Sequence, residues 1–183
     1  MRNYVEMAMD LATRLINHGP VVWVCTKGAD GRYDLAPIAW NCPAAKNPPK
    51  IIVEIGMGHQ TYKNIESAGE FIVAVPHRSQ AELVRQTGSQ SGDEVDKYNE
   101  MGIESFAGKK VDAMVPADCI GYLECKVDKI LTIGEVSVVA GNVIAGFVDD
   151  EAFDGRLLVE KEAGKTIHHL GDQIFAVPGD EVL

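Results

Sequence analysis

Strand-forming segments dominate this chain of 183 residues and restrict its fold more than any other feature. Residues 21–26 are rich in β-branched side chains, Asp30-Gly31 is a tight-turn signal and residues 33–38 form a second run, so an antiparallel hairpin is predicted. Further strands are predicted at residues 51–55, 71–75, 120–133, 136–148 and 173–177. About seven largely antiparallel strands with few helices indicate a mainly β fold, arranged as a closed or nearly closed barrel.

Helices are predicted to be few and peripheral. Apolar residues recur at helical spacing over residues 4–17, and Gly19-Pro20 ends that helix, whose apolar face should pack on the sheet. Short helices are predicted at residues 61–68, 79–87 and about 95–101, with a loop over residues 88–93. Because the chain contains no repeat, low-complexity segment or linker, we expect residues 1–183 to form a single domain.

An anion-binding cradle is predicted where the third strand gives way to a short helix. Gly56 and Gly58 flank this loop, and the backbone N–H groups at the start of a helix lack intrahelical partners and carry the positive end of the helix dipole. Thr61 is expected to cap the helix, and Thr61 and Asn64 to offer side-chain donors to a ligand. An Ala36-Pro37-x-x-Trp40 turn leaves another strand. A phosphate-bearing cofactor is the predicted occupant.

The same loop also resembles a dinucleotide-binding fingerprint. Gly56-x-Gly58-x-x-Thr61 differs from Gly-x-Gly-x-x-Gly only at the third glycine position. A Rossmann unit, however, needs a full crossover helix and an acidic residue at the end of the next strand. Here the helix is about two turns long, and the strand ends in Pro76-His77. The preceding strands also form a hairpin, so a barrel is favoured over a Rossmann fold.

Charge and cysteine content argue against several kinds of partner and site. The net charge of -10 and the absence of a basic run argue against binding to nucleic acid or to an anionic membrane surface. No apolar run approaches the length of a membrane span. Cys25, Cys42, Cys119 and Cys125 show no Cys-x-x-Cys spacing and follow no secretory signal, so reduced thiols in a cytoplasmic protein are expected. No metal-binding or hydrolase motif stands out.

Several segments, taken in their order along the chain, resemble the flavin reductase-like, FMN-binding split-barrel family. In the first half these are Ala36-Pro37-Ile38-Ala39-Trp40, Asn47-Pro48-Pro49-Lys50-Ile51, Thr61-Tyr62-Lys63-Asn64-Ile65 and Gly69-Glu70-Phe71-Ile72-Val73-Ala74-Val75-Pro76. Residues 87–98, 123–127 and 169–171 are similar to its flavoredoxin branch. The likeness extends over nearly the whole chain, from about Pro20 to Gly179.

This resemblance implies an antiparallel split β-barrel with peripheral helices, which binds FMN and forms a homodimer with FMN at the interface. The expected cofactor-binding residues are Ala36, Pro37, Ile38, Ala39, Trp40, Asn41, Cys42, His59, Thr61, Lys63, Asn64, Ser89, Ser91 and His169. No catalytic side chain is implied, because the flavin ring itself carries the redox chemistry. The family often has Ser where Ala39 stands and Arg where Asp93 stands. Two alternatives follow: either Lys63 or Lys97 supplies the positive charge for the phosphate, or the pocket prefers another group.

The implied activity is electron transfer from a reduced nicotinamide, NADH or NADPH, or from a protein redox partner, through bound flavin to an acceptor. Two alternatives stay open: a non-catalytic FMN electron carrier, and a cofactor-free binding module with the same fold. Some of the expected site residues also have a simpler role. Trp40 can be a core or interface anchor, His169 can be structural, and Cys25 and Cys42 are interpreted as small packed side chains rather than redox thiols.

Overall fold

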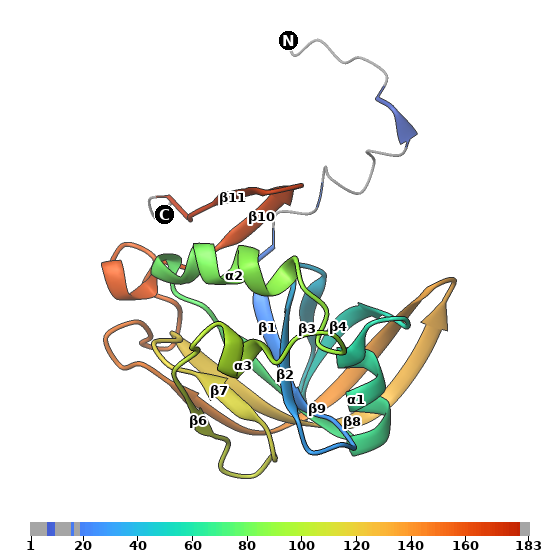
Figure 1. Ribbon diagram of the computed structural model, residues 1–183. Coiled ribbons are helices and arrows are strands. Elements are labelled where there is room, and N and C mark those ends of the chain that lie inside the picture. The colour runs from blue at the N-terminus through green and yellow to red at the C-terminus, as the bar shows by residue number, and fades with distance from the viewer. Residues whose placement is uncertain (1–6, 10–15, 17–18, 180–183) are drawn as a thin grey trace.

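Seven strands form the main sheet of the computed structural model, which describes residues 7–9, 16 and 19–179 (Figure 1). The strands of this sheet pair antiparallel throughout, in the order β2-β1-β5-β8-β9-β4-β3. Their bounds are β1 (Val22–Lys27), β2 (Tyr33–Ile38), β3 (Asn41–Lys46), β4 (Pro49–Gly56), β5 (Glu70–Val75), β8 (Gly121–Ile133) and β9 (Val136–Val148). The helix predicted over residues 4–17 falls largely outside the described residues.

The two edges of this sheet are joined by only two residues. Strand β2 ends at Ile38 and β3 begins at Asn41, so Ala39 and Trp40 form the whole connection between them. The amide of Asn41 donates to the backbone carbonyls of Pro20 and Ile38, and the Trp40 carbonyl accepts from the backbone N–H of Glu54 on β4. Because its two edge strands lie this close, the sheet must curl into a barrel.

Short helices and two small hairpins surround the barrel. Figure 1 shows α2 running beside the β10–β11 hairpin. Helix α1 packs against the barrel, away from this hairpin. The bounds are α1 (Gln60–Ala68), η2 (Arg78–Gln80), α2 (Ala81–Gly88), α3 (Lys97–Glu100), η3 (Glu162–Gly164), β6 (Ser105–Ala107), β7 (Met114–Pro116), β10 (His168–Gly171) and β11 (Ile174–Ala176). None of the helices in the described residues has the length and hydropathy needed to cross a bilayer.

The predicted hairpin and central strands are confirmed, but two regions differ from expectation. Residues 41–46, where no strand was predicted, form the edge strand β3, where Pro43 is tolerated beside a register shift because an edge strand needs fewer ladder hydrogen bonds. Residues 36–38, predicted both as the end of a strand and as the start of the Ala36-Pro37-x-x-Trp40 turn, lie within β2, so only Ala39 and Trp40 bend. The last predicted strand, β11, pairs with β10 in a separate hairpin and does not join the main sheet.

Strand β1 is buried on both faces, which gives the molecule two apolar cores. Val22 and Val24 point into the barrel, where they meet residues from β4, β5, β8 and β9 together with Tyr62 and Ile65 of α1. Trp23 faces the other way, toward α2 and the β6–β7 region. Its indole N–H donates to the Thr87 hydroxyl over 3.1 Å, which fixes the C-terminal end of α2 on the barrel.

A buried carboxylate fixes the loop that follows β6. Glu124 of β8 is fully buried, and its side chain accepts hydrogen bonds from three consecutive backbone N–H groups. The distances are 2.9 Å from Lys109, 2.6 Å from Lys110 and 2.7 Å from Val111. Consecutive N–H groups that converge in this way form an anion-binding nest, here filled by the protein's own side chain.

All four cysteines are free thiols in the structure, and they differ in reactivity. Cys42 lies exposed on β3, whereas burial raises the pKa of the Cys25 and Cys125 thiols to about 12 and raises that of Cys119 as well. Because the thiolate is the reactive form, we expect a short iodoacetamide pulse at pH 8 to label Cys42 alone. Mass spectrometry of native and urea-unfolded protein tests this, and rapid native labelling of Cys25 would contradict it.

Candidate functional site

A cavity of about 270 Å³ opens where β2, β4, the start of α1 and the loop between α2 and α3 meet. We call it the main cavity. Its wall brings together the two segments singled out in the sequence, because Pro37 and Ile38 lie on one side and Gly56, His59 and Thr61 on another. The loop after α2 completes the wall through Gln90, Ser91 and Gly92.

Seven of the fourteen expected cofactor-binding residues line the main cavity. These are Ala36, Pro37, Ile38, Trp40, His59, Thr61 and Ser91. Ala39 and His169 line a neighbouring cavity together with Pro37. Asn41, Cys42, Lys63, Asn64 and Ser89 line neither of these two cavities.

A buried ion pair forms part of the wall of the main cavity. The ammonium of Lys97, at the start of α3, lies 3.2 Å from Oδ1 of Asp34 on β2, and both side chains are almost fully buried. Lys97 also donates to the backbone carbonyl of Leu35 over 2.7 Å. The other carboxylate oxygen of Asp34 accepts from the Thr61 hydroxyl over 3.2 Å. These contacts join β2, α1 and α3 around the cavity.

Two polar side chains of α1 have other roles than those expected. The N-cap of the helix is His59, which makes no side-chain capping bond, so the prediction that Thr61 caps the helix was wrong. Asn64 is buried and donates to the Thr26 hydroxyl over 3.0 Å, while its carbonyl accepts from Gln60 over 2.7 Å. Both side chains therefore form hydrogen bonds within the protein. Nearby, Ser89 donates to the Gln86 carbonyl.

Glycines allow backbone to lie against the cavity residues at close range. A Cβ atom at Gly92 would lie 2.4 Å from the carboxylate carbon of Asp34, and one at Gly88 would lie 3.0 Å from the Pro37 ring. At Gly56 the added atom would lie 2.6 Å from the His59 ring. Glycine at these positions therefore lets the loop after α2 and the loop before α1 close around the cavity.

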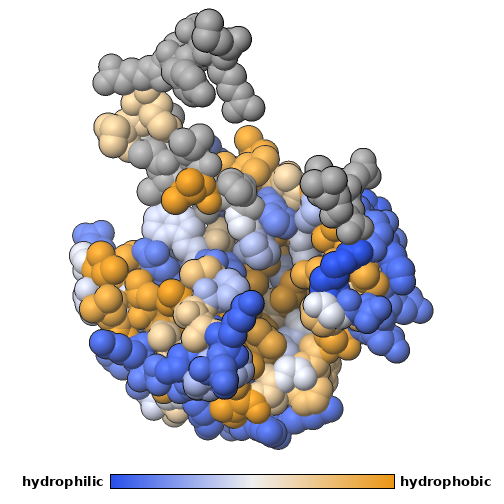
Figure 2. Space-filling view, turned by 180° about the vertical axis from the view of Figure 1, so that it is seen from behind, coloured by the Kyte–Doolittle hydropathy of each residue, from blue (hydrophilic) through white to orange (hydrophobic). Residues whose placement is uncertain are grey.

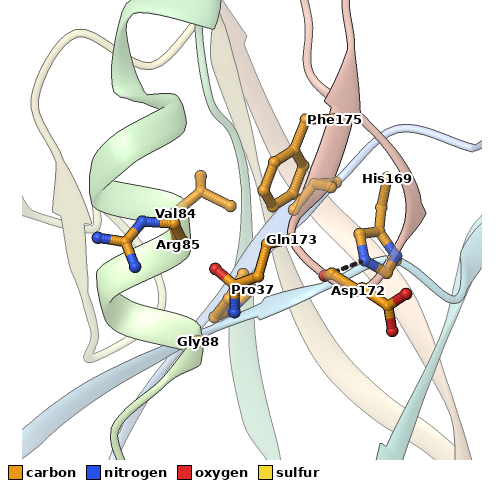
Figure 3. A pocket seen from close by; sticks show the side chains of 10 residues that line it. Pro37, Val84, Arg85, Gly88, His169, Asp172, Gln173 and Phe175 are labelled. Carbon is orange, nitrogen blue, oxygen red and sulfur yellow. Dashed lines mark hydrogen bonds between the residues drawn. The ribbon is translucent and has the colours of Figure 1, made fainter.

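A second cavity of about 160 Å³ adjoins the first and shares Pro37 and Gly88 with it. Figure 3 shows it between α2, which contributes Val84 and Arg85, and the β10–β11 hairpin, which contributes His169 and Phe175. The Nε2 atom of His169 lies 3.0 Å from the carbonyl of Asp172, so it donates there and carries the ring proton. The second cavity is lined by apolar residues such as Val84 and Phe175 and by polar residues such as His169 and Gln173.

The positive side chains near these cavities have acidic neighbours. Lys97 pairs with Asp34, and Arg85 pairs with Glu82 one turn earlier in α2. Lys63 lies near Asp93, whose pKa is lowered mainly by a hydrogen bond from Ser91 and also by the charge of Lys63. The two lysines expected to supply positive charge thus each lie beside a carboxylate.

Sequence reasoning missed Asp34, which lies at the centre of this arrangement. The available signal was an acidic residue within a strand, directly before the Leu35-Ala36-Pro37 segment. Its ion partner lies far along the chain, after the loop that ends α2, and no local pattern links the two positions.

Comparison with protein families gives a match over most of the chain. The model of the flavin reductase like domain matches residues 14–167, a range that contains the whole main cavity but not His169 or Phe175. The Escherichia coli protein YddH is 27% identical over 186 residues, which covers 100% of this chain and 98% of that protein. A flavin reductase (NADH) from Kitasatospora aureofaciens is 32% identical over 127 residues, covering 69% of this chain and 64% of that protein.

Solved structures share the architecture over the full length. The flavoredoxin from Methanosarcina acetivorans superposes with a TM-score of 0.85 at 22% identity, covering 99% of this chain and 94% of that one. An FMN-binding protein from Thermus thermophilus with bound 1-cyclohex-2-enone gives a TM-score of 0.84 at 22% identity, covering 100% and 99%. The predicted antiparallel split barrel is thereby confirmed.

Proposed function

Because the chain belongs to the flavin reductase-like domain family, we propose that it binds FMN in the main cavity and passes electrons from a reduced nicotinamide or a protein donor to an acceptor. One observation carries this proposal. The glycine-flanked junction between β4 and α1 and the Ala36-to-Trp40 segment, which lie apart in the sequence, line one cavity. Pockets of this kind combine apolar walls with a few polar groups that orient the ligand.

The residues of the main cavity suit the uncharged parts of a flavin. Pro37, Ile38 and Val136 offer apolar surface to a planar ring, and Gln90 offers a side-chain amide with hydrogen-bond donors and an acceptor. The first turn of α1 adds backbone N–H groups that favour a phosphate. When bound, a flavin supplies hydride and single-electron chemistry, while the protein orients the ring and excludes water.

The second cavity is the proposed place of the other reactant. It adjoins the main cavity at Pro37 and Gly88, so a group bound there lies beside the flavin site. At about 160 Å³ it is smaller than the main cavity of about 270 Å³, and it therefore suits one ring-sized group. Phe175 and Val84 offer apolar contact to such a ring, and His169 and Gln173 surround it with polar groups.

Binding of FMN is the direct test. We expect the purified protein with FMN to show the absorption bands of oxidised flavin, and its unfolding temperature to rise with FMN concentration. A ligand at one hundred times its Kd stabilises the native state by about 2.7 kcal/mol. Adenosine monophosphate, which has a phosphate but no flavin ring, is the control. A colourless protein with an unchanged unfolding temperature would exclude the proposal, and oxidation of NADH by the loaded protein separates a reductase from a carrier.

We further propose that the protein is a homodimer with FMN at the interface. Trp40 lies on the rim of the main cavity and is 43% exposed. Leu131 and Ile133 at the far end of β8 are more than half exposed, and Val136 of the same hairpin lines the cavity. The β8–β9 hairpin projects to the right in Figure 1 and therefore to the left in Figure 2, which is turned by 180°, and Figure 2 shows apolar surface on that side. A partner that covers this surface would also enclose the flavin.

Substitution in this apolar surface tests the dimer. We expect Leu131→Glu to lower the sedimentation coefficient to that of a monomer and to reduce FMN occupancy, because a charge would be buried at the interface. Phe153→Glu introduces the same charge at an exposed apolar position elsewhere and should change neither property. A wild-type monomer that keeps full FMN occupancy would refute the shared site and leave the fold assignment intact.

A further inference from the structure

The charges around the main cavity do not favour the phosphate of FMN. Among the described residues that line it, the side chains charged at neutral pH are Asp34, Glu54 and Lys97. One ammonium therefore faces two carboxylates. A dianionic phosphate needs positive charge or converging N–H donors to offset the loss of its hydration.

The ammonium of Lys97 is held by Asp34 in a position it cannot easily leave. It lies 3.2 Å from Asp34 Oδ1 and donates to the Leu35 carbonyl over 2.7 Å, and Asp34 accepts in turn from the Thr61 hydroxyl. Asp34 is only 4% exposed and Lys97 only 2%. Little water reaches this pair to screen it, so it acts on a ligand as a dipole and not as a net positive charge.

The start of α1 is the remaining source of attraction for a phosphate. A helix terminus carries the equivalent of roughly half an elementary charge, less than the unit charge of the Glu54 carboxylate that lines the same cavity. The attraction of the helix is therefore opposed within the site.

We propose that Asp34 determines which flavin the cavity accepts: by neutralising Lys97 it removes the preference for phosphate, so that neutral riboflavin binds about as well as FMN. This inference rests on the proposed flavin-binding function. The protein would then recognise a flavin by its ring and its ribityl hydroxyls, and neutral flavins are expected to be ligands of this protein. Asp34 acts through Lys97 and is a specificity-determining residue rather than a catalytic one.

Dissociation constants for FMN and riboflavin test this, measured by flavin fluorescence on the full-length wild type, Asp34→Asn and a control. For the wild type we expect the two constants to agree within about threefold. Asp34→Asn leaves the charge of Lys97 uncompensated in a buried setting, so FMN binding should tighten on the order of tenfold or more while riboflavin binding stays unchanged. Asp128→Asn is the matched control, since Asp128 pairs with Lys50 on the surface and does not line the cavity.

Two further measurements keep the test decisive. If Asp34→Asn does not fold, Glu54→Gln removes the other carboxylate of the cavity and should shift the preference toward FMN in the same direction. A wild type that binds FMN thirtyfold or more tightly than riboflavin overturns the inference and leaves the proposed function standing. An unchanged preference in a folded Asp34→Asn protein overturns it too. If neither flavin binds the wild type, the proposed function and this inference both fail.

Discussion

Replacing Glu124 with alanine is expected to destabilise the protein by roughly 3–5 kcal/mol, a large part of the roughly 5–15 kcal/mol by which a typical native protein is stable. The substitution removes the acceptor of three backbone N–H groups, those of Lys109, Lys110 and Val111, and leaves an internal space where a fully buried side chain stood. Each buried donor without a partner costs about 1–3 kcal/mol. Urea unfolding followed by circular dichroism measures the change.

Two further variants distinguish the effect of losing the Glu124 carboxylate from the effect of losing side-chain volume or a surface charge. Glu124→Gln keeps the shape but presents an NH₂ group to one side of the nest, so an intermediate loss of stability is expected. Glu151→Ala removes an exposed acid of the same type and should stay within about 0.5 kcal/mol of the wild type. If Glu124→Ala were as stable as Glu151→Ala, the nest would not stabilise the fold.

Gly92→Ala is expected to destabilise the protein by about 1–3 kcal/mol and to weaken flavin binding by on the order of tenfold or more. The added methyl carbon would lie 2.4 Å from the carboxylate carbon of Asp34, which cannot move without breaking its pair with Lys97. The loop after α2 would have to shift outward, and that loop forms part of the cavity wall. Thermal unfolding and FMN titration report the two effects.

Gly58→Ala is the matched control for this prediction. Gly58 lies in the loop before α1, and a Cβ atom there would meet no atom within 4 Å. The unfolding temperature and the flavin affinity of the Gly58→Ala protein should therefore equal those of the wild type. If both alanine variants weakened binding equally, a general effect of loop stiffness would explain the result better than the contact with Asp34.

Local sequence patterns predicted the central strands because buried strands contain the β-branched and apolar residues on which strand prediction depends. Val22 to Thr26 is rich in β-branched residues and buried on both faces, and the Asp30-Gly31 turn joins it to β2. Strand β3 was missed because Pro43, Ala44 and Ala45 have low strand propensity. Its formation depends on pairing with β4, a tertiary contact that a propensity does not contain.

For the site, the sequence identified the right segments but not the role of each polar group. The β4–α1 loop and the Ala36-to-Trp40 segment do line one cavity. Thr61 and Asn64, however, form hydrogen bonds with Asp34 and Thr26, residues 27 and 38 positions earlier. Such pairings depend on how the barrel closes. A motif in the sequence cannot distinguish a hydrogen-bond donor that faces a ligand from one that already bonds to another residue of the protein.

The pairing of β4 with β9 has a consequence for biosynthesis. Lys50 lies opposite Asn142 and Gly56 opposite Val136, so β4 has no partner on that side until the second half of the chain has been made. A nascent chain that ends before β8 therefore leaves one edge of β4 and one edge of β5 without a partner strand, and unpaired edges of this kind are templates for pairing with other chains. Barrel closure is thus a late, non-local step, and contacts of such sequence separation are formed slowly.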